Sequence, residues 1–325
     1  MGVEEMKKIF SMLAILVVII ALVGCSMDKE TSSTTNATKS SHDGSLKVGL
    51  SMNTLNNPFF VAVKEGAEAQ AKEKGVELVV TDAQNDPGKQ LADVENLLQQ
   101  NIDILIIDPA DSDAIAEAVR KANDAKIPVF TIDRQSNGGK VVTHIGFDAI
   151  KSGRIAGNFL KKALNGKGKI VEIQGILGTN VAQLRSKGFN EIMEQTPGFE
   201  VVARQSANFD RGQALKVMED ILQAHPEIDG VYAANDEMAL GALAAIEAAG
   251  RLDEIVVIGC DAVDPALEAI RQGKLEATIA EPPFFLGKEA INTALKISKG
   301  EKVEKEVILE STLVTRENVD QVKTK

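Results

Sequence analysis

From residue 46 onward, short apolar runs rich in valine and isoleucine alternate with amphipathic stretches. The runs of the first half are KVGLSM, VELVVT, IDILIID, IPVFTI and VVTHIG, and those of the second half are GKIVEIQG, FEVVARQ, IDGVYAA, IVVIGCD and ATIAEP. Stretches such as PFFVAVKEGAEAQAKEKG carry apolar residues at spacings of three and four and end in glycine, which is typical of helices. Continuous apolar strands that alternate with helices indicate parallel sheets covered on both faces. The pattern therefore predicts an α/β fold with two doubly wound parallel-sheet lobes of about five strands each.

The start of the chain has a different pattern. Lys7 and Lys8 precede an apolar run that extends to Val23 and is followed by Gly24 and Cys25. A basic segment, a hydrophobic segment and a small-residue cleavage site together predict an export signal over residues 1–24. The run is shorter than the roughly 20 apolar residues that a membrane-spanning helix needs. The sequence LVGC resembles a bacterial lipobox, which implies that Cys25 is lipidated and becomes the first residue of the mature protein; an ordinary secretory signal is the alternative.

Residues 26–45 should form a flexible tether. Half of them are serine or threonine, and Met27 is the single large apolar residue. A segment of this composition cannot bury a core. With a lipidated Cys25, the segment 25–45 predicts a protein held at the cell membrane by a lipid anchor on the extracytoplasmic side.

Composition excludes several classes of protein. Cys25 and Cys260 are the two cysteines, so lipidation of the first leaves no intrachain disulfide and stability must come from a hydrophobic core. The chain is 44% hydrophobic, which is sufficient for such a core. A formal net charge of -11 without a basic block makes nucleic acid an unsuitable partner.

Polar and aromatic side chains follow the predicted strands. Ligands of doubly wound sheets bind outside the carboxyl ends of the strands, so these residues are the candidate site: Asn53, Asn57, Phe59, Phe60, Asp133, Arg134, Arg185, Phe209, Asn235, Asp261 and Glu281. Amides and carboxylates can bind neighbouring hydroxyl groups, arginine donates in a fork, and rings pack on C–H faces, so the set suits a polyhydroxylated ligand. Several of these residues also have a structural alternative: Asn57, Asn235 and Asp261 could be helix N-caps, and Phe59 and Phe60 could form a hydrophobic staple.

The segments TLNNPFF, DSDA, IPVFTIDRQ, THIGFD, FDRGQAL, HPEIDGVYAANDEMALGAL and EATIAEP resemble the ribose type of periplasmic sugar-binding protein, the receptor of an ABC sugar importer. The resemblance runs from about Lys47 to the C-terminus. By position, it implies sugar contacts at Asn57, Phe59, Phe60, Asp133, Arg134, Arg185, Phe209, Asn235 and Asp261.

The resemblance also implies two lobes joined by a three-segment hinge, the fold of type I periplasmic binding proteins. The N-terminal lobe would contain residues 46–148 and 282–310, and the C-terminal lobe residues 149–281 and 311–325. The family implies a monomer that closes on one sugar and delivers it to a membrane permease.

Three positions depart from the ribose pattern. Asn53 stands in place of a serine, Cys260 in place of an aromatic ring, and Glu281 in place of a glutamine. We expect the small side chain of Cys260 to widen the pocket, and the charge of Glu281 to be balanced by an arginine or a proton. The expected ligand is then a monosaccharide or polyol other than ribose, or ribose together with larger relatives such as hexoses.

Other functions have weaker support in the sequence. No G-x-S-x-G motif is present and the three histidines lack zinc spacing, so we expect neither an enzyme nor a metal or other cofactor. A sugar-responsive repressor would need a DNA-binding helix-turn-helix where this chain has a lipobox. A receptor that passes a sugar signal to a kinase or chemotaxis partner remains the alternative to transport.

Overall fold

The computed structural model describes residues 45–323. The predicted signal segment, Cys25 and the tether up to residue 44 lie outside these residues. None of the helices between residues 45 and 323 is long and apolar enough to cross a membrane.

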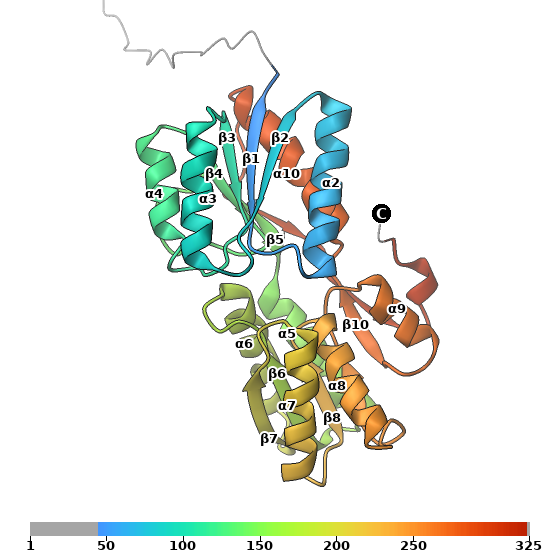
Figure 1. Cartoon of the computed structure of the whole chain (residues 1–325). Coiled ribbons are helices and arrows are strands. Elements are labelled where there is room, and N and C mark those ends of the chain that lie inside the picture. Colours follow the sequence, from blue (N-terminus) through green and yellow to red (C-terminus); the bar gives the residue numbers. More distant parts are fainter. Residues whose placement is uncertain (1–44, 324–325) are drawn as a thin grey trace, which may run out of the picture. The chain divides into compact units, whose positions relative to one another are not determined.

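The first sheet has six strands in the order β11-β5-β4-β3-β1-β2, and all of them are parallel. Its strands are β1 (Lys47–Met52), β2 (Glu77–Asp82), β3 (Ile104–Ile107), β4 (Val129–Ile132), β5 (His144–Phe147) and β11 (Glu306–Leu309). Helices α2 (Pro58–Lys74) and α10 (Pro283–Ser298) pack together on one face, and α3 (Pro87–Gln99) and α4 (Ala116–Asp124) cover the other (Figure 1).

The central strand β3 shows why this sheet is covered on both sides. All four of its residues are buried. Because successive side chains of a strand point to opposite faces, Ile104 and Ile106 join the core under α2 and α10, whereas Leu105 and Ile107 join the core under α3 and α4. The continuous apolar run in the sequence therefore corresponds to a strand between two helical layers.

The second sheet repeats this arrangement with the order β12-β10-β9-β8-β6-β7. Its strands are β6 (Lys167–Gln174), β7 (Gly198–Ser206), β8 (Gly230–Ala233), β9 (Val256–Ile258), β10 (Ala277–Ala280) and β12 (Thr312–Thr315), of which only β12 runs antiparallel to its neighbour. The helices are α5 (Ala149–Ala163), α6 (Asn180–Glu194), α7 (Arg211–Ala224), α8 (Asp236–Ala248) and α9 (Asp264–Arg271), followed by a 3₁₀ turn, η2 (Val319–Gln321). The predicted fold class, two doubly wound α/β lobes, is confirmed.

The backbone passes between the two sheets three times (Figure 1). These crossings lie between β5 and α5, between β10 and α10, and between β11 and β12. Strands β11 and β12 were not among the predicted strands. Each adds one edge strand to a different sheet, and both are short, so their alternating exposure gives a weaker sequence signal than the buried central strands.

His144 on β5 gives the fold a defined pH dependence. Its ring is 7% exposed, its Nδ1 lies 3.0 Å from Thr131 Oγ1, and burial lowers its pKa from 6.5 to about 4. The unfolded chain therefore binds a proton at this residue more readily than the folded chain. The stability contributed by the neutral ring is present above pH 6.5 and is lost as the pH falls toward 4.

We expect this residue to remove roughly 3 kcal/mol from the free energy of unfolding between pH 7 and pH 4. His144→Gln, which does not titrate but can still bond to Thr131, should lose less stability over the same interval. Denaturant unfolding of both proteins at the two pH values measures the difference. Parallel stability curves for the two proteins would contradict the assignment to His144.

Candidate ligand-binding site

A small cavity lies where the carboxyl ends of the two sheets face each other. It is lined by Asn57, Phe59, Phe60, Asp133, Arg134, Val181, Arg185, Phe209, Asn235 and Asp261. The first five belong to the lobe of the first sheet and the other five to the lobe of the second. A ligand in this cavity would therefore contact both lobes at once.

Every predicted site residue except Asn53, Cys260 and Glu281 lines this cavity. Val181 is the one lining residue that the sequence reasoning missed. It is the second residue of α6, two positions after the capping residue Thr179. An apolar residue at that position looks like ordinary helix packing, so the sequence contained no signal that would have singled it out.

The two lining asparagines act as helix caps and also face the cavity. Asn57 Oδ1 accepts a hydrogen bond from the Phe59 amide at 2.9 Å, and Asn235 Oδ1 accepts one from the Met238 amide at 3.0 Å. Capping uses the carbonyl oxygen of each side chain. The amino group, which can donate two hydrogen bonds, remains for a ligand. The structural and functional interpretations of these residues are thus compatible.

Arg134 connects the aromatic rings of the two lobes. Its guanidinium carbon lies 5.3 Å from the centre of the Phe60 ring and 5.4 Å from that of Phe209. Phe59 packs edge-on against Phe60 with ring centres 5.2 Å apart. Arg134 is 2% exposed, and its Nη1 donates to the Pro109 carbonyl at 3.1 Å. The cation–π contacts fix the orientation of the guanidinium, and the rings present flat apolar faces to the cavity.

Arg185 is the corresponding charge on the second lobe. Its Nη1 donates to the Ala234 carbonyl at 2.7 Å, and its Nη2 bonds to Glu281 and lies 3.5 Å from Asp261 Oδ1. The backbone around Arg185 is held by close helix packing, since a Cβ on Gly153 of α5 would lie 2.1 Å from the Arg185 carbonyl oxygen. The absence of a side chain at Gly153 therefore lets α6 bring Arg185 to the cavity.

Burial shifts the acid–base balance of the two lining carboxyl groups. It raises the pKa of Asp133, an effect that Arg134 and Arg185 oppose. It raises the pKa of Asp261 well above its usual range, again against the influence of Arg185. Ligand hydroxyl groups that donate hydrogen bonds to these carboxylates would favour their charged forms.

Three lining residues have left-handed backbone conformations. The φ angles are 53° at Asp133, 59° at Phe209 and 126° at Asp261. Such conformations cost free energy for residues other than glycine and are concentrated at ligand sites, where the surrounding structure maintains them. Each of these three residues lies just after the end of a strand, where the chain turns toward the cavity.

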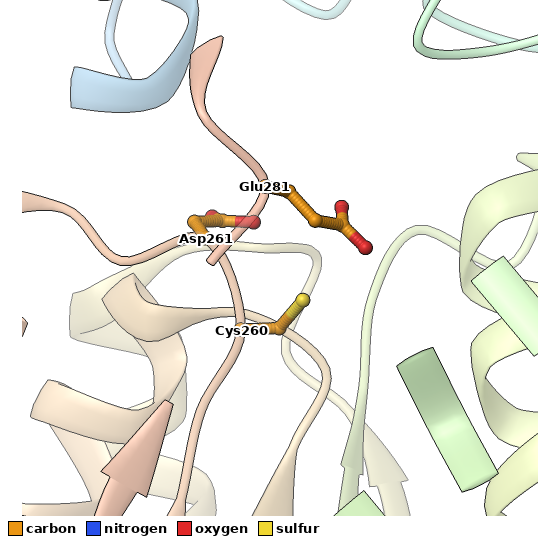
Figure 2. Close-up of side chains that lie close together, drawn as sticks. All are labelled: Cys260, Asp261 and Glu281. Atoms are coloured by element: carbon orange, nitrogen blue, oxygen red, sulfur yellow. The ribbon is translucent and has the colours of Figure 1, made fainter. Parts of the chain in front are cut away.

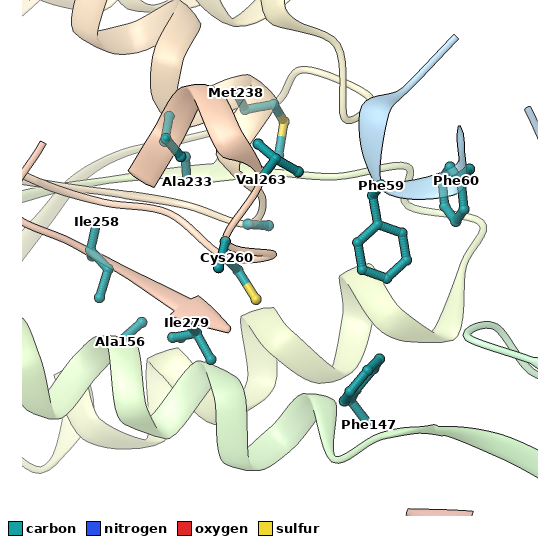
Figure 3. Packing of buried hydrophobic residues seen from close by; sticks show 14 of the residues in the cluster. Phe59, Phe60, Phe147, Ala156, Ala233, Met238, Ile258, Cys260, Val263 and Ile279 are labelled. Atoms are coloured by element: carbon teal, nitrogen blue, oxygen red, sulfur yellow. The ribbon is translucent and has the colours of Figure 1, made fainter. Parts of the chain in front are cut away.

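The three positions that depart from the ribose pattern lie outside the cavity lining. Asn53 is completely buried, and its Oδ1 accepts a hydrogen bond from the Thr54 amide at 2.5 Å. Cys260 is also completely buried and packs in the apolar core near Ile279 and Val263 (Figure 3). Its small side chain belongs to that core, so its position does not support the expected widening of the pocket.

Glu281 lies behind the cavity and is 1% exposed. With Cys260 and Asp261 it forms a group of metal-ligand type, in which one potential ligand atom of each residue lies within 4.8 Å of the others (Figure 2). Arg185 contacts both carboxylates of this group. Arg185 thus places a positive charge directly beside Glu281, as expected from the sequence.

Hydrogen bonds at the edge of the cavity join the two lobes. The Ser112 amide donates to the Gly178 carbonyl at 3.0 Å, the Asn180 amide donates to Ser112 Oγ at 3.1 Å, and the Gln135 amide donates to Asn180 Oδ1 at 3.0 Å. Ser112 lies in the DSDA segment, one of the segments that resemble the ribose type of sugar-binding protein. These contacts connect α6 to the first lobe and stabilise the closed arrangement.

Asn180→Ala should favour the open arrangement, because it removes the oxygen that accepts hydrogen bonds from the Gln135 amide at 3.0 Å and from Ser112 Oγ at 3.4 Å while leaving the cavity lining intact. Each lost hydrogen bond corresponds to roughly 0.5–1.5 kcal/mol, or about a 2- to 13-fold loss of ligand affinity. Calorimetric titration would measure this loss, with Gln183→Ala on the exposed side of the same helix as control. An unchanged affinity would show that this contact does not contribute to closure.

Comparison with known proteins agrees with this geometry. A family model described as a periplasmic binding protein domain matches residues 48–302. The chain is 44% identical over 305 residues to the ribose import binding protein RbsB of Bacillus subtilis, which covers 93% of this chain and 97% of that protein.

Solved structures that share the fold include the following two. One is an ABC transporter solute binding protein from Bacillus halodurans C-125 with bound myo-inositol, at a TM-score of 0.83, 35% identity, and coverage of 86% of this chain and 98% of that one. The other is the fructose binding periplasmic domain of the hybrid two component system BT1754, at a TM-score of 0.82, 30% identity, and coverage of 85% and 93%. Together with the two lobes and the cavity between them, these matches show that the chain belongs to the family of periplasmic binding proteins.

Proposed function

We propose that this protein captures a monosaccharide between its two lobes and delivers it to the permease of an ABC-type importer. The observation that carries the proposal is the cavity lined by amides, carboxylates, arginines and phenylalanine rings from both lobes. Hydroxyl groups of a sugar can donate to Asp133 and Asp261 and accept from Arg134 and Arg185, while its C–H faces pack on the rings. The similarity to a ribose import binding protein supports this assignment.

The first candidate ligand is a pentose of the ribose type. The departures at Cys260 and Glu281, on which the expectation of a different ligand rested, lie outside the cavity lining. The lining itself keeps the nine residues at which the ribose resemblance implies contacts. Hexoses and myo-inositol are the competing ligands, and the related structure with bound myo-inositol makes the cyclitol a necessary member of any comparison.

A thermal-shift panel of pentoses, hexoses, deoxy sugars, pentitols and myo-inositol tests the proposed function. A ligand that binds the folded state raises the melting temperature in proportion to RT ln(1 + [L]/Kd). D-Ribose should give the largest shift, and the recovered sugar should be chemically unchanged. If no sugar or polyol shifted the melting temperature at millimolar concentration, the proposed function would be wrong.

A sensing receptor is the second candidate. The related periplasmic domain of a hybrid two component system has the same fold, and a closed binding protein could be recognised equally well by a permease or by a signalling partner. Deletion of the gene separates the two functions. Loss of growth on the sugar indicates transport, whereas normal growth with loss of a sugar-induced response indicates sensing.

We further propose a lipid-anchored monomer on the extracytoplasmic face of the cell membrane. The support is the sequence LVGC before a segment rich in serine and threonine. Cys25→Ser should yield a precursor that is not acylated and a protein that is not retained by membranes. Equal membrane retention of Cys25→Ser and wild type would contradict the lipid anchor.

A further inference from the structure

One carboxylate contacts all three regions in which the chain passes between the lobes. Glu281 lies in the crossing between β10 and α10, and Ser311 lies in the crossing between β11 and β12. Ser152 lies in the first turn of α5, directly after the crossing from β5. These residues are far apart in the sequence, yet each is at most 5% exposed and all three meet in one buried cluster.

Hydrogen bonds hold this cluster together. Ser152 Oγ donates to Glu281 Oε1 at 2.5 Å, and Ser311 Oγ donates to the same oxygen at 3.3 Å. The two serine oxygens are 3.2 Å apart, and Ser152 Oγ also lies 3.2 Å from the Asp148 carbonyl oxygen. A hydroxyl group has one proton to donate, and the charged carboxylate at the shortest distance is its strongest acceptor. Glu281 Oε1 therefore accepts hydrogen bonds from Ser152 and Ser311, which belong to the other two crossing regions.

The second oxygen of Glu281 faces the ligand site. Its Oε2 bonds to Arg185 Nη2, and the same nitrogen lies 3.5 Å from Asp261 Oδ1. Both Arg185 and Asp261 line the cavity, whereas Glu281 does not. One oxygen of the carboxylate thus bonds to the serines of the hinge, and the other bonds to Arg185, which would contact the ligand.

We propose that Glu281 is a positioning residue that couples occupation of the cavity to the hinge. It orients Arg185 toward the ligand and holds the three crossing segments in the arrangement of the closed lobes. The inference rests on the proposed sugar-binding function for its ligand, but the hinge contacts exist without a ligand. A glutamine at this position could still bond to the serines and to Arg185, but it would lack the charge that strengthens these bonds.

Hydrogen–deuterium exchange on the full chain tests the hinge part without any sugar. Glu281→Ala should speed amide exchange at least tenfold in all three crossing regions, residues 145–152, 278–286 and 307–314. Ser311→Ala should speed it less in the same regions. Glu172→Gln is the matched control, because Glu172 is equally buried and bonded to an arginine but lies on β6 away from the crossings. Faster exchange in 278–286 alone, or an equal response in the control, would overturn the proposal.

Titration with D-ribose tests the coupling. Glu281→Gln should weaken D-ribose binding about tenfold through Arg185, whereas Ser311→Ala should change it less than threefold. Saturating D-ribose should slow exchange of the three crossing regions in wild type and Ser311→Ala, but much less in Glu281→Gln. Equal protection of Glu281→Gln and wild type would contradict the coupling role.

Two possible failures of these experiments can be told apart from failure of the proposal. If Glu281→Ala does not fold, Glu281→Gln and Ser311→Ala decide the proposal, because exchange in the three crossings must still respond together in Ser311→Ala. If D-ribose fails to bind the wild type, the assignment of the sugar is wrong. The exchange experiment without ligand then still supports or overturns the hinge role of Glu281.

Discussion

Arg185→Met should weaken sugar binding by at least about a hundredfold, which corresponds to roughly 2.7 kcal/mol of binding free energy. The guanidinium lines the cavity, bonds to Glu281 and lies 3.5 Å from Asp261. Removing one partner of a buried ion pair costs about 3–5 kcal/mol, because a charge remains buried without compensation. The variant would thus lose the guanidinium that donates to the sugar. It would also lose the group that holds Glu281 and Asp261 in place.

The matched control for this variant is Arg204→Met. Arg204 bonds to Glu172 at 2.6 Å on the same lobe, but its side chain is 46% exposed and it does not line the cavity. Calorimetric titration of both variants measures the loss of affinity, and their melting temperatures separate it from a loss of stability. Arg185→Lys should be intermediate, because lysine keeps the charge without the planar fork. An affinity of Arg185→Met within threefold of wild type would exclude Arg185 as a ligand contact.

Asp133→Ala should weaken sugar binding about 10- to 100-fold. Asp133 lies at the end of β4, is 8% exposed, and its Oδ2 is 3.8 Å from Arg134 Nε. Hydrogen bonds to charged groups contribute roughly 1.5–3 kcal/mol each. The alanine variant loses such an acceptor for sugar hydroxyl groups and leaves Arg134 without its neighbouring carboxylate.

Asp133→Asn separates the two contributions, since it keeps the size and one acceptor of the side chain but removes the charge. Asp113→Ala, which changes an exposed acid of the same lobe that accepts a hydrogen bond from Asn137, is the control. Titration calorimetry should rank the affinities as wild type, Asp133→Asn and Asp133→Ala, with the control close to wild type. A loss of less than threefold in Asp133→Ala would show that this carboxylate does not contact the sugar.

The sequence was sufficient to predict the central strands and most of the cavity lining. Within IDILIID, the four strand residues Ile104–Ile107 are all apolar because both faces of the strand are covered. Since parallel strands end at the same edge of a sheet, the polar residues that follow them converge without any local signal of contact. Phe59 and Phe60 could therefore be assigned to a site, although they are also typical of the first turn of a helix.

The orientation of side chains after a strand could not be predicted in the same way. Cys260 and Asp261 are neighbours, yet the thiol belongs to the core and the carboxyl group lines the cavity. Glu281 follows a strand as well, but its partners Ser152 and Ser311 come from other crossings, and the sequence pattern does not show that they meet. The edge strands β11 and β12 were missed for a related reason, because their short, partly exposed sequences resemble a loop.

Solution scattering with and without sugar tests most directly that the ligand is captured between two lobes that close. The closed state is stabilised by the contacts of Ser112 with Gly178 and Asn180, and a ligand touching both lobes should favour it over the open state. We expect a smaller radius of gyration at a saturating concentration of the best ligand from the sugar panel, and no compaction of Asp133→Ala at the same concentration. A radius of gyration of the wild type that does not change at saturation would contradict this expectation.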